Sequence, residues 1–187
     1  ALTDLGVKKG NTVALFMWNS PEFIIAFFGA LKAGGTVTAL NPSFKEKDAK
    51  YQLEDSESVI VIVDDEQYPV IANIWNEVSR LKNVIVVGEK RHTDIYLFNE
   101  LVEKYPSNPP KVKINPKKDL AVLQYTAGTT GLPKGCMLTH FNIISNMFQL
   151  ILTHGLEGSR DDIILAHLPF YHIYGMNILI CLSVCFD

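Results

Sequence analysis

The sequence comprises 187 residues, of which 48% are hydrophobic, so it is long enough to fold as one domain around a buried core. Its net charge is −3 and no basic run marks a nucleic-acid or membrane-surface patch, so we expect no nucleic-acid partner. The three cysteines form no Cys-x-x-Cys pair and no secretory signal is recognisable, which together indicate reduced thiols in a cytoplasmic protein. Cys181, Cys185, His167 and His172 could bind a metal by residue type, but zinc-finger spacing is missing and ordinary buried cysteines are favoured.

The first forty residues predict a strand, a helix and a second strand. Residues 12–17 form an apolar run that is typical of a buried strand. Ser20 is a suitable N-cap and Pro21 suits the first helical position, and the following helix, up to residue 33, is apolar nearly all round. This run is far shorter than the about 20 apolar residues that a membrane span needs, so we expect no transmembrane segment. Residues 36–40 predict the next strand.

Helices and strands continue to alternate up to residue 87. The predicted elements are a polar helix over residues 45–55, a strand over 58–63, an amphipathic helix over 68–81 and a strand over 84–87. This alternation predicts an α/β fold, in which a doubly wound, mostly parallel sheet is flanked by helices.

The composition then changes: residues 104–118 contain four prolines and five lysines, as in a solvated surface crossover. We therefore expect an α/β subdomain over residues 1–105, a crossover over 106–118 and a second subdomain over 119–187. Residues 119–126 predict the strand that opens this second part.

Residues 125–135, with the sequence YTAGTTGLPKG, have the composition of a phosphate-binding loop. Glycines bring backbone N–H groups close to an anion, hydroxyls donate hydrogen bonds and the lysine supplies a positive charge. A flexible surface hairpin is the alternative, but the stiff Pro133 beside Lys134 argues against it. The spacing matches neither a Walker A motif nor the Rossmann fingerprint, which disfavours an NTPase or a dinucleotide-dependent dehydrogenase.

This stretch closely resembles the phosphate-binding signature Y-T-S-G-[ST]-T-G-x-P-K-G of the adenylate-forming superfamily, and it departs from that signature only at Ala127. The early segments LGVKKGNTVALFMWNSPEFIIAFFGALKAGG and ALNPSF also look like this superfamily. The resemblance implies that the chain is part of the large N-terminal domain of such an enzyme. It also implies that ATP phosphates are held by Thr126, Ala127, Gly128, Thr129, Thr130, Gly131 and Lys134, and that the Thr129 hydroxyl reaches the bound Mg²⁺.

Downstream of the loop, residues 135–138 predict a short return strand. Thr139 is a good N-cap for a helix over residues 140–154, which ends at Gly155. Five residues along one face of this helix predict a stripe that packs in the core: Phe141, Ile144, Met147, Phe148 and Ile151. Residues 163–167 predict a further strand.

A second motif, P-x-x-H-x-x-G, spans Pro169, His172 and Gly175. Taken alone, it is a buried aromatic turn with one hydrogen-bonded histidine. Its order and distance after the loop resemble the next signature of the same superfamily. By that resemblance, His172 is the catalytic candidate, which orients the substrate carboxylate or gates its tunnel, and Phe170 and Tyr171 form the wall. Residues 176–186, an apolar run, predict a core helix.

The resemblance implies an ATP-dependent acid–thiol ligase, most like a fatty acyl-CoA synthetase. Such an enzyme converts a carboxylic acid and ATP to an acyl-adenylate and then passes the acyl group to coenzyme A, with Mg²⁺ as cofactor. The alternatives are a non-catalytic nucleotide-binding module, a structural α/β domain, or another adenylating branch, such as an aryl-CoA ligase or a peptide-synthetase adenylation domain. Sequence alone does not decide between a monomer and a homodimer.

The superfamily's adenine contacts, Mg²⁺-binding glutamate and catalytic lysine come later in its sequence pattern than residue 187. We therefore expect the chain to be the N-terminal part of a longer polypeptide and to be inactive by itself.

Overall fold

The computed structural model describes residues 1–126, 131–155, 158–159 and 161–185, and these residues form a seven-stranded mixed sheet. The strand order is β5-β4-β3-β1-β2-β6-β7; every neighbouring pair is parallel except β6 and β7, which are antiparallel. The strands are β1 Thr12–Phe16, β2 Thr36–Ala39, β3 Ser58–Asp64, β4 Asn83–Val87, β5 Tyr96–Leu97, β6 Leu120–Thr126 and β7 Lys134–Thr139. The predicted doubly wound, mostly parallel α/β fold is confirmed.

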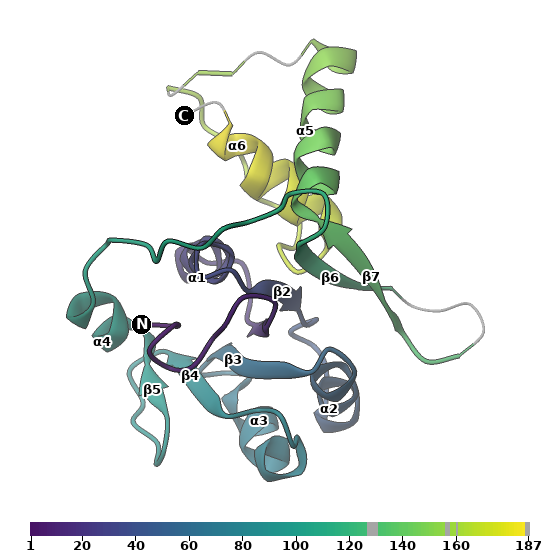
Figure 1. The fold of residues 1–187 in the computed structure, drawn as a ribbon. Coiled ribbons are helices and arrows are strands. Elements are labelled where there is room, and N and C mark those ends of the chain that lie inside the picture. The colour runs from purple at the N-terminus through teal and green to yellow at the C-terminus, as the bar shows by residue number, and fades with distance from the viewer. Residues whose placement is uncertain (127–130, 156–157, 160, 186–187) are drawn as a thin grey trace.

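Helices cover both faces of the sheet (Figure 1). The α-helices are α1 Pro21–Lys32, α2 Glu46–Asp55, α3 Tyr68–Ile74, α4 Phe98–Lys104, α5 His140–His154 and α6 Leu182–Val184. A 3₁₀ turn, Trp75–Glu77, follows α3, and a π-helical segment, Gly175–Cys181, leads into α6. The core on one face contains α1 and the π-helical segment, whereas α2 and α3 pack on the other face.

The strands β1, β3 and β4 are buried on both faces because their side chains alternate between these two cores. Val13 and Leu15 belong to the core on the α1 side, and Ala14 and Phe16 belong to the core on the α2 side. Residues of the central strands are therefore apolar in succession, which is the pattern that two-sided burial requires.

Helix α1 has the local signals that the sequence predicted. The Ser20 hydroxyl accepts a hydrogen bond from the Phe23 N–H at 3.2 Å, and Pro21 occupies the first turn. At the other end, Gly34 adopts a φ of +81°, a left-handed conformation that a residue with a Cβ rarely adopts. The helix start and stop are thus fixed by three residues close to its two ends.

Helix α5 also has the predicted bounds, but its predicted burial is wrong. Thr139 and Asn142 form a reciprocal capping box at its start, and Gly155 ends it with a φ of +59°. Of the five residues in the predicted core stripe, only Met147 is buried in the described part of the chain, whereas Phe141, Ile144 and Phe148 are exposed. Within the described residues α5 packs mainly against β7, β6 and the π-helical segment, and most of the stripe faces away from them.

Two further expectations differ from the structure, and two short elements were not expected. The strand predicted at residues 163–167 does not form, and Ile163 is 97% exposed, because no described strand lies beside it to supply a hydrogen-bond ladder. The helix predicted over residues 68–81 ends as an α-helix at Ile74, where the chain tightens into a 3₁₀ turn. Strand β5 and helix α4 were not predicted, since a two-residue strand and a seven-residue helix carry too little periodicity.

Within the described residues, no helix combines the length and the apolar character that a membrane crossing requires. The proposed division into subdomains stays a prediction. Strands from residues before and after the crossover, β2 and β6, pair in the one sheet through Val37 and Val122.

Candidate functional site

The predicted phosphate loop connects the two strands of a β-hairpin. Strand β6 leads into the loop and β7 leaves it, and their register places Thr126 opposite Lys134. Both residues are exposed, and directly opposed residues of an antiparallel pair lie on the same face of the hairpin. The structure therefore brings together one hydroxyl and one cationic side chain where the hairpin meets the loop.

Four of the predicted site residues lie outside the described residues: Ala127, Gly128, Thr129 and Thr130. The others, Thr126, Gly131 and Lys134, are described, and all three are exposed. Among the described residues Lys134 forms no ion pair, so its ammonium group is available to an anion where the hairpin meets the loop. This arrangement fits phosphate binding, which needs an accessible positive charge next to hydrogen-bond donors.

Gly135 is the residue that lets the hairpin adopt its local packing. Tyr125 lies opposite Gly135, and a Cβ added at Gly135 would be 3.1 Å from Cζ of the Tyr125 ring. The ring therefore lies over the backbone of β7. Burial, together with the hydrogen bond to the Asp55 carboxylate, raises the pKa of Tyr125, so its hydroxyl stays protonated and donates.

Helix α2 contacts the hairpin on both sides of the loop. The Tyr125 hydroxyl donates a hydrogen bond to Oδ2 of Asp55, and the Tyr51 hydroxyl donates to the Pro133 carbonyl at 2.7 Å. Tyr125 is the first residue of the predicted loop, and Pro133 lies near its end, directly before β7. A single helix thus holds the chain where it enters and where it leaves the predicted phosphate loop.

The position of α2 is itself fixed by a buried chain of hydrogen bonds. Gln52, which is 2% exposed, donates to the Thr38 hydroxyl at 2.9 Å, and this hydroxyl donates to the Leu123 carbonyl at 2.9 Å. These bonds run from α2 through β2 to β6. The helix and the base of the hairpin are therefore fixed relative to each other by buried and partly buried polar groups.

The opposite face of β6 contacts the second motif. Gln124, adjacent to Tyr125, is buried and donates from Nε2 to the Tyr171 carbonyl at 3.2 Å. Successive side chains of a strand point to opposite faces, so Gln124 and Tyr125 join β6 to different neighbours. The two sequence motifs are connected by this contact, which places His172 one residue from the link.

The second motif forms a tight turn that ends in a π-helical segment. The His172 N–H donates to the Pro169 carbonyl at 3.2 Å, and the Met176 N–H donates to the His172 carbonyl at 2.9 Å. A Cβ at Gly175 would lie 2.1 Å from the Pro169 oxygen, so glycine is needed at this position. The close approach of the Pro169 carbonyl therefore explains the glycine of the motif, and backbone bonds of His172 close the same compact turn.

His172 itself is exposed. Its Nδ1 accepts a hydrogen bond from the Tyr174 N–H at 3.2 Å, which leaves Nε2 to carry the proton of the neutral ring. Phe170 is buried and packs against Phe23 with ring centroids 5.6 Å apart, and Tyr171 is half-buried. The role of both residues as a pocket wall stays a prediction. The catalytic role of His172 stays a prediction.

Asn19 positions the segment that precedes His172, and it was not predicted from the sequence. Its Nδ2 donates to the Leu168 carbonyl at 2.8 Å, and its Oδ1 accepts from the Phe170 N–H at 2.7 Å. Gln124, Tyr51 and Asp55 were missed in the same way. In the sequence they are simply polar residues next to a motif or on a predicted helix. Such residues are too common to be recognised as part of a site.

The described residues contain no cluster of three or more histidine, cysteine or acidic side chains that could hold a metal ion. Thr129, the predicted Mg²⁺ contact, lies outside the described residues, and its contact with the metal stays a prediction. The three cysteines are free thiols. Burial raises the pKa of the Cys181 thiol to about 12, which makes it a poor nucleophile.

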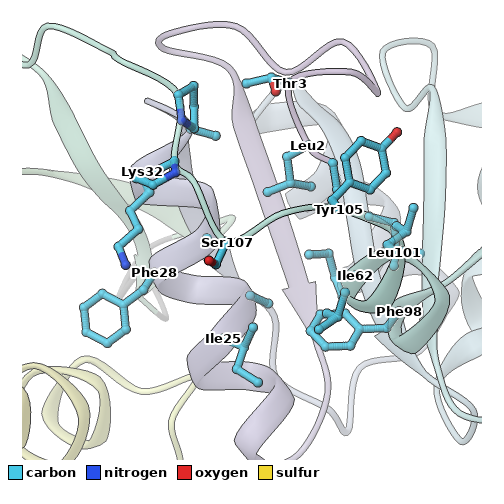
Figure 2. A pocket seen from close by; sticks show the side chains of 18 of the residues that line it. Leu2, Thr3, Ile25, Phe28, Lys32, Ile62, Phe98, Leu101, Tyr105 and Ser107 are labelled. Carbon is cyan, nitrogen blue, oxygen red and sulfur yellow. The ribbon is translucent and has the colours of Figure 1, made fainter.

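A separate hollow of about 550 Å³ lies between α1, α4 and the proline-rich crossover. Figure 2 shows its largely apolar lining, with Ile25 and Phe28 from α1 and Phe98 and Leu101 from α4. None of the described site residues lines this hollow. It is therefore distinct from the hairpin and the histidine turn.

Known proteins with similar sequences and folds are acyl- and aryl-CoA ligases. The chain is 32% identical over 205 residues to the long-chain-fatty-acid–CoA ligase of Bacillus subtilis, covering 96% of this chain and 36% of that protein. It is 34% identical over 183 residues to 4-coumarate–CoA ligase CCL1 of Humulus lupulus, covering 96% of this chain and 33% of that protein. The chain thus spans about a third of the length of these relatives.

The fold is similar to that of the long-chain-fatty-acid-CoA ligase FadD1 from Archaeoglobus fulgidus. The TM-score is 0.86 at 29% sequence identity, and the similarity covers 98% of this chain and 35% of that one. The family model described as AMP-binding enzyme matches residues 1–185. Because this match extends over nearly the whole sequence, the chain belongs to the family of AMP-binding enzymes.

Proposed function

We propose that this chain provides the phosphate-binding part of an ATP-dependent acid–thiol ligase, which activates a fatty acid as its acyl-adenylate and transfers it to coenzyme A. The observation that supports this most strongly is the phosphate-loop hairpin, in which Thr126 and Lys134 face each other beside a loop of the family's sequence. The family match over residues 1–185 agrees with it. We also propose the cytoplasm, where ATP and coenzyme A are available, as its location.

The chemistry of adenylation explains why such a site is needed. The attacking carboxylate and the ATP triphosphate are both anions, so the reaction depends on positioning and on charge neutralisation. Lys134 would neutralise phosphate oxygens, and Thr126 with the loop residues would donate hydrogen bonds to them. His172 would orient the carboxylate. The Gln124–Tyr171 hydrogen bond supports this role because it joins the turn that contains His172 to β6, the strand that leads into the loop.

Two classes of acid are represented among the relatives. The named relatives act on long-chain fatty acids in one case and on 4-coumarate in another, at 32% and 34% identity. An aryl-CoA ligase is therefore the second candidate. An exchange experiment separates the two if it includes fatty acids of different length, 4-coumarate and benzoate.

The test is carboxylate-dependent ATP–pyrophosphate exchange by the full-length protein and by its Lys134→Ala variant. Loss of one hydrogen bond to a charged group costs about 1.5–3 kcal/mol, so kcat/KM for ATP should fall about ten- to hundredfold. Lys47→Ala is the matched control, because Lys47 is an exposed lysine of α2 that forms no ion pair among the described residues. It should leave the exchange rate unchanged.

Three other results would lead to other conclusions. ATP binding without exchange for any acid would indicate a non-catalytic nucleotide module. Unchanged nucleotide binding after combined Lys134→Ala and Thr129→Ala substitution would indicate a structural domain. Exchange with 4-coumarate but with no fatty acid would replace the fatty acid by an aromatic one.

A further inference from the structure

The outer part of the β6–β7 hairpin has few attachments to the rest of the protein. Strand β2 pairs with β6 at Val37 and Val122, and the Thr36 and Thr38 hydroxyls add bonds to the Leu120 and Leu123 carbonyls. Beyond Leu123 the two strands pair only with each other and run outward from the sheet (Figure 1). Contacts of side chains must therefore determine where the outer end of the hairpin lies.

Two of these contacts come from one turn of α2. Tyr51 and Asp55 are four residues apart, so they lie on the same face of the helix, and they bond to Pro133 and Tyr125 respectively. Gln52, between them, fixes the helix to β2 through its bond to Thr38. The helix is thus a fixed support, and its two polar side chains reach the hairpin on both sides of the phosphate loop.

The negative charge of Asp55, considered by itself, would disfavour ATP binding at this site. A carboxylate near a site for ATP repels the triphosphate, so its charge alone would weaken nucleotide binding. Its contact with the Tyr125 hydroxyl instead fixes the strand that leads into the loop. A favourable role for Asp55 must therefore come from position.

From these observations we propose that Tyr51 and Asp55 are positioning residues: they hold the two ends of the phosphate loop so that Lys134 and Thr126 meet the phosphates of ATP. The inference rests on the proposed function in taking ATP as the ligand. It adds to that function two residues of α2, more than 60 residues before the loop in sequence, that touch no substrate themselves.

The test uses the full-length protein with Tyr51→Phe and Asp55→Ala, measured by ATP–pyrophosphate exchange and by equilibrium binding of ATP. Each variant loses one hydrogen bond at a loop end, so KM and Kd for ATP should rise about three- to tenfold. The KM for the carboxylic acid should stay at the wild-type value, and the thermal midpoint should fall only by the small amount that one lost hydrogen bond costs, because a general structural defect would change both strongly. If charge alone mattered, Asp55→Ala would lower the KM for ATP, which is the opposite sign.

Matched controls come from the same chain. Glu54→Ala removes an equal charge from the neighbouring residue of α2, and Tyr96→Phe removes an exposed tyrosine hydroxyl on β5. Among the described residues, neither side chain forms a hydrogen bond or an ion pair with the hairpin. Both should leave KM for ATP unchanged. In a double-mutant cycle, Asp55→Ala combined with Tyr125→Phe should cost no more than either change alone, since both remove the same bond.

The results separate this inference from the proposed function. A wild-type protein that shows no exchange contradicts the ligase assignment, and ATP binding then still measures the effect of the α2 variants. Variants that match their controls, or an Asp55→Ala variant that binds ATP more tightly, overturn the positioning role while the ligase assignment stands. A wild-type protein that binds no ATP overturns both.

Discussion

Gly175 shows how one missing side chain can define a motif. The Pro169 carbonyl approaches its Cα so closely that a Cβ would lie 2.1 Å from the oxygen, and the next closest backbone atom would be 2.8 Å away. These atoms belong to the backbone and cannot rotate aside. The last position of the P-x-x-H-x-x-G motif is therefore a packing requirement of the turn that holds His172.

The Gly175→Ala substitution should lower the free energy of unfolding by about 1–3 kcal/mol, because overpacking forces the turn to shift. Gly29→Ala provides a control with the opposite expected sign. Gly29 lies inside α1 with no atom within 4 Å of the added Cβ, so alanine should stabilise the helix by about 0.5–1 kcal/mol. Urea unfolding of both variants measures the difference, and equal effects would contradict the close approach of the Pro169 carbonyl to Gly175.

At the scale of elements, local signals predicted α5 well and its environment poorly. Thr139 and Gly155 fix its ends through their own backbone and side-chain bonds, and these are visible in sequence. Which face is covered depends on elements far away in the chain. Phe148 is 58% and Leu152 is 80% exposed, so the apolar character of this helix does not by itself reveal its surroundings.

Two substitutions on α5 should therefore differ strongly when this chain is studied alone. Met147→Ala removes a buried side chain and should cost about 2–5 kcal/mol of unfolding free energy. Phe148→Lys changes an exposed residue and should stay within about 0.5 kcal/mol. It should also reduce binding of a hydrophobic dye, because it interrupts an exposed apolar surface. A Phe148→Lys variant as unstable as Met147→Ala would mean that this face is covered, for instance by a second copy.

At the scale of the whole molecule, apolar runs predicted the sheet because a strand that is buried on both faces needs consecutive apolar residues. The strand order and the short β5 have no comparable pattern in the sequence. The motif residues of the candidate site could also be recognised in the sequence, and so could the glycines that its turns need. Contacts such as Tyr125 with Asp55, which are 70 residues apart, depend on the packed fold and could not be predicted from local patterns.

The chain spans about a third of the length of its named relatives, which leads to a prediction for the molecule as a unit. The 187-residue chain alone should show negligible acyl-adenylate formation, whereas the full-length protein should show ATP–pyrophosphate exchange. The comparison uses the same acids and ATP concentrations for both. Turnover by the chain alone at the full-length rate would contradict the expectation that it is inactive by itself.

The alternation of Gln124 and Tyr125 on β6 has a consequence for how this region tolerates change in evolution. One side chain joins the strand to the histidine turn and the next joins it to α2. An inserted or deleted residue just before this pair would exchange the two faces, and both contacts would be lost together. Substitutions that keep the strand length alter one of these contacts at a time. This part of β6 should therefore tolerate substitutions better than insertions or deletions.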